Sequence, residues 1–210
     1  MATPYTDTSM LRYAITSRNI VSGSANTNAE LLARTAGWIK NGIELIQLRE
    51  PDLPAATLVM LARTIVEQIG ICASPTKLLL NSRADIALAA GAHGVHLTAA
   101  PGELTPEQVR TVYAAANRPP PIVTVSCHTL PEVLRAREYR VDAVLFAPVF
   151  EKPLPGQLPR AGQGLERLHE ASLAAAPVPV YALGGVTEEN SVSCLQAGAA
   201  GVAGIRLFHE

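Results

Sequence analysis

The sequence has little charge, few aromatic residues and few cysteines. Lys and Arg number 17 and Asp and Glu 18, so the net charge of −1 offers no basic surface to a nucleic acid. Aromatic residues make up 4% of the 210 residues, but 48% are hydrophobic, which predicts a core of Ala, Val, Leu and Ile. The cysteines Cys72, Cys127 and Cys194 are far apart, which argues against a disulfide framework and a thiolate zinc site.

Long apolar runs are also missing. No stretch approaches the ~18 residues that a membrane-spanning helix needs. The first residues, Met1–Ser9, are polar and lack the apolar stretch of a signal peptide. We therefore expect a cytoplasmic protein without a membrane partner or a nucleic-acid partner.

Short aliphatic runs alternate with Ala- and Leu-rich helical patterns along the chain. The predicted strands are Leu11–Ile15, Ile43–Leu48, Lys77–Leu80, Gly94–Leu97, Ile122–Val125, Ala143–Phe146, Val178–Ala182 and Gly201–Ile205. The predicted helices are Asn28–Lys40, Pro54–Ile69, Ala84–Ala90, Pro106–Ala116, Leu130–Glu138, Gly164–Ala175 and Glu188–Ala197. This alternation predicts an α/β fold, a (β/α)8 TIM barrel that forms a single domain over residues 1–210, with a doubly wound sheet as the alternative.

Only Arg206–Glu210 follow the last predicted strand, so we expect the eighth helix to be truncated or missing. Its absence would leave apolar barrel surface near the first and last strands. Either the N-terminal segment covers this surface or a homodimer buries it.

The carboxyl ends of the strands form the active site of a TIM barrel, and polar residues or glycines follow several predicted strands. These residues are Gln47, Arg49, Asn81, Ser126, His128, Gly184, Gly185 and Gly204. The three glycines predict a phosphate site, because glycine lets backbone N–H groups approach phosphate oxygens. No cluster of side chains has the spacing of metal ligands, so no metal site is predicted.

Arg49 and His128 are the strongest candidates for chemistry. Arg49 follows an apolar strand and is predicted to bind an anion, with an ion pair to Glu50 as the alternative. His128 precedes a helix that Thr129 is expected to cap, which favours a neutral acid/base imidazole; a hydrogen bond to loop backbone is the alternative. His96 lies within an apolar run, so we expect a structural role for it.

The segment Glu151–Gly162 contains three prolines and two glycines after the sixth predicted strand. A connection of this length is typical of a lid or a binding loop, and a tolerated surface insertion is the alternative.

Six motifs in register resemble the thiamine phosphate synthase/TenI superfamily between about Tyr13 and Arg206. They are Gln47-Leu-Arg-Glu50, Asn81-x-Arg83-x-Asp-Ile-Ala-Leu88, Ala89-Ala-Gly-Ala-x-Gly-Val-His-Leu97, Ser126-x-His-Thr129, Ala182-x-Gly-Gly-Val186 and Ala197-Gly-Ala-x-Gly-Val-Ala203. The resemblance implies a barrel that binds a phosphorylated thiazole. Its members include synthases, which join hydroxymethylpyrimidine pyrophosphate to thiazole phosphate, and TenI-like tautomerases, which aromatise a thiazole carboxylate phosphate by proton transfer.

The sequence departs from the synthase pattern where Mg²⁺ and pyrophosphate would bind. Pro51 and Ser82 stand at a lysine and an aspartate position, Thr98–Pro101 lacks a second aspartate, and Lys152–Pro155 replaces a Thr-x-Thr-Lys loop. Since pyrophosphate release needs such charges, these departures favour a TenI-like thiazole tautomerase, an isomerase without a cofactor. A synthase, a transferase with Mg²⁺, and a non-catalytic thiazole-phosphate binder with a regulatory role are the alternatives.

On the tautomerase reading, His128 is the catalytic acid/base. The substrate-binding residues are Gln47, Arg49, Asn81, Ser126, Lys152 and Gly162. The phosphate-binding residues are Gly184, Gly185 and Gly204.

Overall fold

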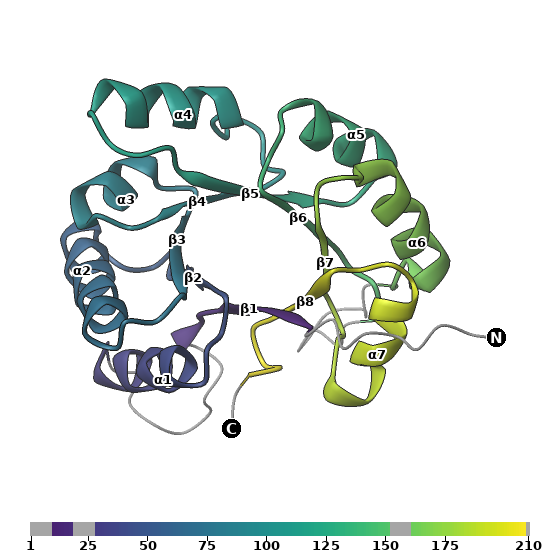
Figure 1. The fold of residues 1–210 in the computed structure, drawn as a ribbon, viewed down its shortest axis with the longest axis horizontal. Coiled ribbons are helices and arrows are strands. Elements are labelled where there is room, and N and C mark those ends of the chain that lie inside the picture. The colour runs from purple at the N-terminus through teal and green to yellow at the C-terminus, as the bar shows by residue number, and fades with distance from the viewer. Residues whose placement is uncertain (1–9, 19–27, 152–160, 209–210) are drawn as a thin grey trace.

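The computed structural model describes residues 10–18, 28–151 and 161–208, which form a closed barrel of parallel strands in the order β1 to β8 (Figure 1). The strands are β1 Leu11–Ile15, β2 Leu45–Leu48, β3 Lys77–Asn81, β4 Gly94–Leu97, β5 Ile122–Cys127, β6 Ala143–Phe146, β7 Val180–Ala182 and β8 Gly201–Gly204. The helices are α1 Asn28–Lys40, α2 Ala55–Ile71, α3 Ala84–Ala90, α4 Pro106–Ala115, α5 Leu130–Glu138, α6 Gly164–Ala175 and α7 Glu188–Gln196. The predicted TIM-barrel fold is confirmed.

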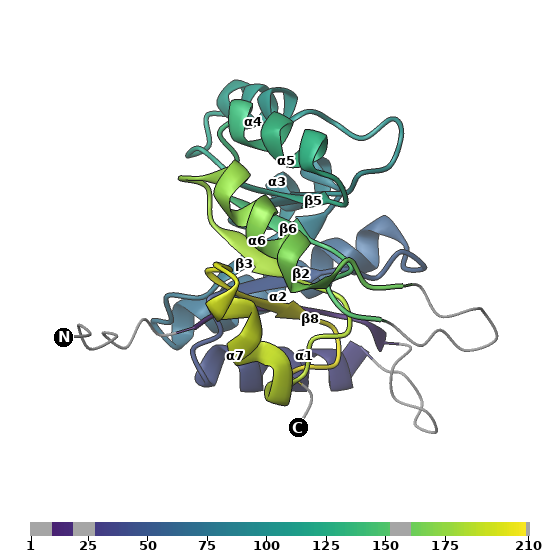
Figure 2. The same ribbon diagram turned by 90° about the vertical axis from the view of Figure 1, so that its right-hand side faces the viewer.

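Apolar residues fill both sides of the strand ring. Inside the barrel, Tyr13, Leu79, Leu145 and Tyr181 pack against one another. Outside it, larger clusters fill the space between the strands and the surrounding helices, which form an outer layer (Figure 2). Burial on both faces explains why the strands read as continuous aliphatic runs rather than as alternating patterns.

Five strands, β2, β3, β5, β7 and β8, have bounds that differ by one or two residues from the predicted ones, and hydrogen bonding explains the two cases of β2 and β5. β2 begins at Leu45 because the Ile43 N–H donates to the Trp38 carbonyl (3.0 Å), which belongs to the end of α1. β5 extends to Cys127 because that residue still pairs with Phe146 of β6. Capping boxes begin α4 at Thr105 and, as expected, α5 at Thr129.

No helix follows β8 within the described residues, which end at Phe208. The Trp38 indole N–H of α1 donates to the Phe208 carbonyl (2.7 Å), so the end of the described chain lies against α1. A cavity of about 500 Å³ remains between α1 and α7, lined in part by Met10, Trp38 and Leu207. The homodimer and the single-domain extent over residues 1–210 stay predictions.

The described part of the chain contains no helix with the length and apolarity needed to cross a membrane.

Candidate active site at the carboxyl end of the barrel

A cavity of about 340 Å³ opens at the carboxyl end of the strands, where the sequence places the site. Six of the predicted site residues line it together: Gln47, Arg49, Asn81, Ser126, His128 and Gly184. Gly185, Gly204 and Gly162 are not among its lining residues. Lys152 lies outside the described residues. The structure thus brings together residues from four strand ends, while their individual roles stay predictions.

A line of hydrogen bonds starts at Gln47 and Asn81 in the wall of this mouth cavity and leads away from it to Glu103. The Gln47 amide N–H donates to Asn81 Oδ1 (3.2 Å), and the Asn81 amide N–H donates to Ser82 Oγ (3.2 Å). The Ser82 hydroxyl in turn donates to Glu103 Oε2 (2.6 Å). Because a carboxylate only accepts, Glu103 fixes the donor and acceptor orientation of the whole line.

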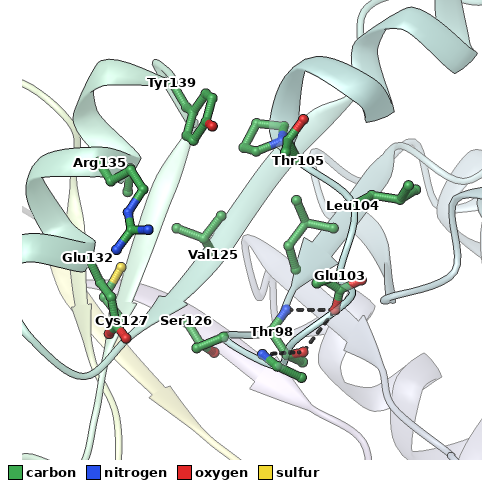
Figure 3. Close-up of a pocket in the computed structure, with 15 residues that line it drawn as sticks. Thr98, Glu103, Leu104, Thr105, Val125, Ser126, Cys127, Glu132, Arg135 and Tyr139 are labelled. Carbon is green, nitrogen blue, oxygen red and sulfur yellow. Dashed lines mark hydrogen bonds between the residues drawn. The ribbon is translucent and has the colours of Figure 1, made fainter.

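Glu103, which the sequence analysis missed, lines a neighbouring pocket rather than the mouth cavity, and Thr98 borders both. Its Oε2 also accepts hydrogen bonds from the Thr98 backbone N–H (3.1 Å) and hydroxyl (2.8 Å), as Figure 3 shows. Glu103 belongs to the loop between β4 and α4, where no periodic pattern indicates which side chains turn inward. The one available signal was a lone carboxylate in a loop that follows a strand.

These donors and acceptors do not fit a magnesium ion held by carboxylates of this chain. Mg²⁺ is bound in proteins through one or two carboxylates with near-octahedral oxygen ligands. Here three hydrogen-bond donors already point at Glu103 Oε2. The described residues contain no group of three or more His, Cys, Asp or Glu side chains that could hold a metal ion. The sequence-based expectation that no cofactor is needed stays a prediction.

Arg49 presents its side chain at the mouth rather than to its neighbour. Its backbone N–H donates to Thr16 Oγ1 (2.9 Å), which fixes the end of β2, and its side chain is exposed. The buried Glu50 pairs instead with the Arg18 guanidinium (3.3 Å). Among the described ion pairs, none joins Arg49 to Glu50, so the structural alternative for Arg49 is wrong.

His128 is held by the backbone and by the start of α5. Its Nδ1 lies 2.8 Å from the Ala147 carbonyl oxygen, which can only accept, so a neutral His128 carries its proton on Nδ1. Glu132 of the α5 capping box accepts hydrogen bonds from the backbone N–H groups of His128 and Thr129. The bond to loop backbone that we considered is therefore present, and it leaves an acceptor lone pair on Nε2.

The predicted phosphate glycines are required by backbone geometry. Gly184 has φ of +93° and lines the mouth, and a Cβ there would lie 2.8 Å from the Pro148 Cα. Gly185, with φ of +65°, would place a Cβ 2.6 Å from the Glu151 carbonyl. Close packing thus accounts for glycine at both positions, as it does at Gly204, where a Cβ would lie 2.7 Å from a Leu207 side-chain carbon. Phosphate binding at these glycines stays a prediction.

Gly162 has a similar packing reason. A Cβ at this position would lie 2.6 Å from the Phe150 Cα, in the segment that follows β6. Its predicted contact with substrate stays a prediction as well.

Comparison with known proteins gives the family. The profile described as "Thiamine monophosphate synthase" matches residues 13–208. A "Putative thiamine-phosphate synthase" of Geobacter sulfurreducens is 38% identical over 194 residues, which cover 91% of this chain and 83% of that protein. A "Thiamine-phosphate synthase" of Caldanaerobacter subterraneus subsp. tengcongensis is 32% identical over 195 residues, 92% of this chain and 83% of the relative.

A solved structure supports the fold. "Thiamine phosphate pyrophosphorylase from Pyrococcus furiosus" superposes with a TM-score of 0.74 over 94% of this chain and 86% of its own. The two sequences are 23% identical, so this likeness concerns the barrel alone.

The prediction of a tautomerase is wrong in this light, and so is the isomerase class. The relatives at 32–38% identity are named thiamine-phosphate synthases, which are transferases, and nothing supports the TenI-like branch over the synthases. The departures at Pro51, Ser82 and Thr98–Pro101 therefore do not establish a different reaction. From Tyr13 to Phe208, this chain belongs to the thiamine monophosphate synthase family.

Proposed function

We propose that the protein is a transferase of the thiamine-phosphate synthase type, which joins a pyrimidine pyrophosphate to a phosphorylated thiazole. In this reaction the thiazole nitrogen forms a bond to the methylene carbon of hydroxymethylpyrimidine pyrophosphate. The bond from that carbon to oxygen breaks, and pyrophosphate leaves with the electron pair. The observation that carries the proposal is the gathering of Gln47, Arg49, Asn81 and Ser126 in one mouth cavity of a chain that belongs to this family.

The cavity offers groups suited to anionic ligands. Arg49 supplies a permanent positive charge at its rim, and Ser126 supplies a hydroxyl. Gly184 adds a backbone without a side chain to block close approach. Donors aimed at a leaving anion stabilise the charge that develops as the bond to oxygen breaks. The described residues thus support the binding of phosphorylated small molecules as substrates.

The amide pair and His128 would orient the uncharged parts of the substrates. Gln47 donates one amide hydrogen to Asn81, so its Oε1 remains as an acceptor. The Nε2 lone pair of His128 is a second acceptor. Two acceptors of fixed orientation select ligand N–H or O–H groups, which is a task of positioning rather than of proton transfer.

Incubation with the two substrates tests the proposal. We expect thiamine phosphate and pyrophosphate to form together, with the reaction measured at several Mg²⁺ concentrations because metal can enter with the pyrophosphate. Heat-treated protein and the exposed variant Leu173→Ala are the controls. Saturable binding of thiazole phosphate without any product would instead indicate a non-catalytic binder and would refute the transferase.

A further inference from the structure

Four polar side chains form a continuous line through the barrel interior. The Tyr13 hydroxyl lies 3.0 Å from Thr124 Oγ1, which lies 2.9 Å from His96 Nδ1. The other ring nitrogen of His96, Nε2, lies 2.9 Å from Ser126 Oγ. Tyr13, His96 and Thr124 are buried, and His96 and Ser126 both border the mouth cavity. The line therefore runs from the barrel centre to the candidate active site.

Backbone register explains why these residues meet. His96 of β4 and Thr124 of β5 are direct cross-strand partners. Ser126 lies two residues further along β5, so its side chain points to the same side of the strand as Thr124. Tyr13 reaches the line from β1 across the barrel, and its ring contacts the His96 ring edge to face with centroids 6.3 Å apart.

The buried Tyr13 hydroxyl determines which atom donates in each hydrogen bond of the line. Among the described residues, Thr124 is the hydrogen-bond partner of the Tyr13 hydroxyl. If Tyr13 accepted, its single hydrogen would be buried without an acceptor, a penalty that corresponds to roughly 5- to 150-fold in a folding equilibrium. Tyr13 therefore donates to Thr124, and burial raises the pKa of its phenol, which keeps this hydrogen in place.

The remaining protons are then fixed in turn. Thr124 accepts from Tyr13 and uses its own hydrogen to donate to His96 Nδ1. Desolvation by burial, followed by the nearby charge of Arg49, lowers the pKa of His96 to about 3, so the ring is neutral. A neutral imidazole carries one N–H, which must be on Nε2, because Nδ1 accepts.

We infer that His96 is a positioning residue for the site: its Nε2–H donates to Ser126 Oγ and so turns the Ser126 hydroxyl hydrogen into the mouth cavity. Ser126 has no other side-chain hydrogen bond to the described residues. The mouth cavity thus presents the Ser126 hydroxyl to a ligand as a hydrogen-bond donor of fixed direction. Such a donor selects an accepting oxygen, such as an anionic oxygen of a phosphate or a pyrophosphate. This last step rests on the proposed function, whereas the protonation of His96 does not.

The proton position can be observed directly by NMR. In protein labelled with ¹⁵N at histidine, long-range ¹H–¹⁵N correlations separate a protonated ring nitrogen from an unprotonated one. At neutral pH we expect the proton of His96 on Nε2 and that of His128 on Nδ1, so the two rings serve as opposite references within one spectrum. Variants His96→Gln and His128→Gln assign the signals. A proton on His96 Nδ1 would overturn the inference.

Two tyrosine variants test the origin of this order. Tyr13→Phe removes the buried donor, so Thr124 can turn and the Nδ1–H form of His96 should appear. Tyr181→Phe is the matched control, since Tyr181 is a buried neighbour of Tyr13 (ring centroids 5.6 Å apart) outside the line. Unchanged His96 signals in Tyr13→Phe would show that Tyr13 does not set the direction.

Calorimetry with inorganic pyrophosphate tests the donor itself. Loss of one hydrogen bond to a charged oxygen weakens binding about 10- to 100-fold, which is the effect expected for Ser126→Ala. Ser172→Ala, whose hydroxyl donates to a helix carbonyl in α6, should bind like the wild type. Equal binding by Ser126→Ala would refute the donor role. If the wild type binds no pyrophosphate while His96 carries its proton on Nε2, the proposed function fails and the assignment of His96 stands.

Discussion

The burial of His96 predicts how the stability of the barrel depends on pH. The pKa of His96 is lowered to about 3 in the folded protein, mainly by desolvation, while an unfolded histidine titrates near 6.5. Below pH 6.5 the unfolded state therefore binds a proton that the folded state does not. The folded state loses stability as the pH falls through this window, toward pH 3.

The magnitude follows from the linkage between protonation and folding. Each pH unit below the unfolded pKa lowers the free energy of unfolding by about 1.4 kcal/mol. Between pH 7.5 and pH 5.0, the contribution of His96 is a loss of about 2 kcal/mol. The pKa of the half-buried His93 is lowered as well, by desolvation and then by the charge of Lys77, and adds to the same trend.

Urea unfolding of matched variants isolates this contribution. His96→Gln removes the titrating ring, so its loss between pH 7.5 and pH 5.0 should be about 2 kcal/mol smaller than that of the wild type. His169→Gln, at an exposed position on α6, should lose as much as the wild type. The ring signals of His96 should also remain unchanged between pH 5 and pH 9. Equal losses in all three proteins, or titration of His96 near pH 6, would refute the reasoning.

Three further predictions concern the wall and the rim of the site. Glu103→Ala should lower the free energy of unfolding by about 2 kcal/mol, because three hydrogen-bond donors lose their acceptor. The control Glu138→Ala, at an exposed position, should change it by less than about 0.5 kcal/mol. Similar urea midpoints for the two variants would contradict this prediction. In calorimetry, Mg²⁺ alone should release no binding heat with the wild type. Ser82→Asp should gain Mg²⁺ binding, because the new carboxylate would lie beside that of Glu103. Strong Mg²⁺ binding by the wild type would contradict this prediction. Gly184→Ala should lower the melting temperature, because alanine is strained at this positive φ. Gly70→Ala in α2, where a Cβ meets nothing within 4 Å, should raise the melting temperature slightly. A higher melting temperature for Gly184→Ala than for Gly70→Ala would contradict the strain at Gly184.

Most of the fold could be predicted because its signals are local. Aliphatic runs, helical patterns and the helix cap at Thr129 each depend on a few neighbouring residues. Strand ends were predicted less well where pairing decides them. β5 extends past Val125 only because β6 offers partners for Ser126 and Cys127, and no pattern within the strand itself indicates this.

Six of the predicted site residues line the mouth cavity, but the contacts between them were not predicted. Gln47, Asn81 and Ser126 follow from the rule that strand ends form the mouth of a barrel. Glu103 was missed because a loop has no periodicity from which to infer the direction of a side chain. His96 was expected to be structural, and only the register of β4 and β5 connects it to Ser126.

The reaction was predicted wrongly because missing charges were weighed above overall similarity. Ser82 stands at one expected carboxylate position, and Thr98 begins the segment Thr98–Pro101 that lacks the other. Both side chains nevertheless donate hydrogen bonds to Glu103, a carboxylate from another position in the chain. The absence of a residue type at one position therefore does not determine which reaction a site catalyses. Side chains that approach from other loops must be known as well.

Simultaneous measurement of both products in one reaction tests the central claim most directly. Wild-type protein, supplied with hydroxymethylpyrimidine pyrophosphate and thiazole phosphate, should release pyrophosphate and thiamine phosphate in equal amounts, and Ser126→Ala should do so at least about 10-fold more slowly. Absence of thiamine phosphate above the level without protein, under conditions in which an authentic synthase turns over, would contradict the account.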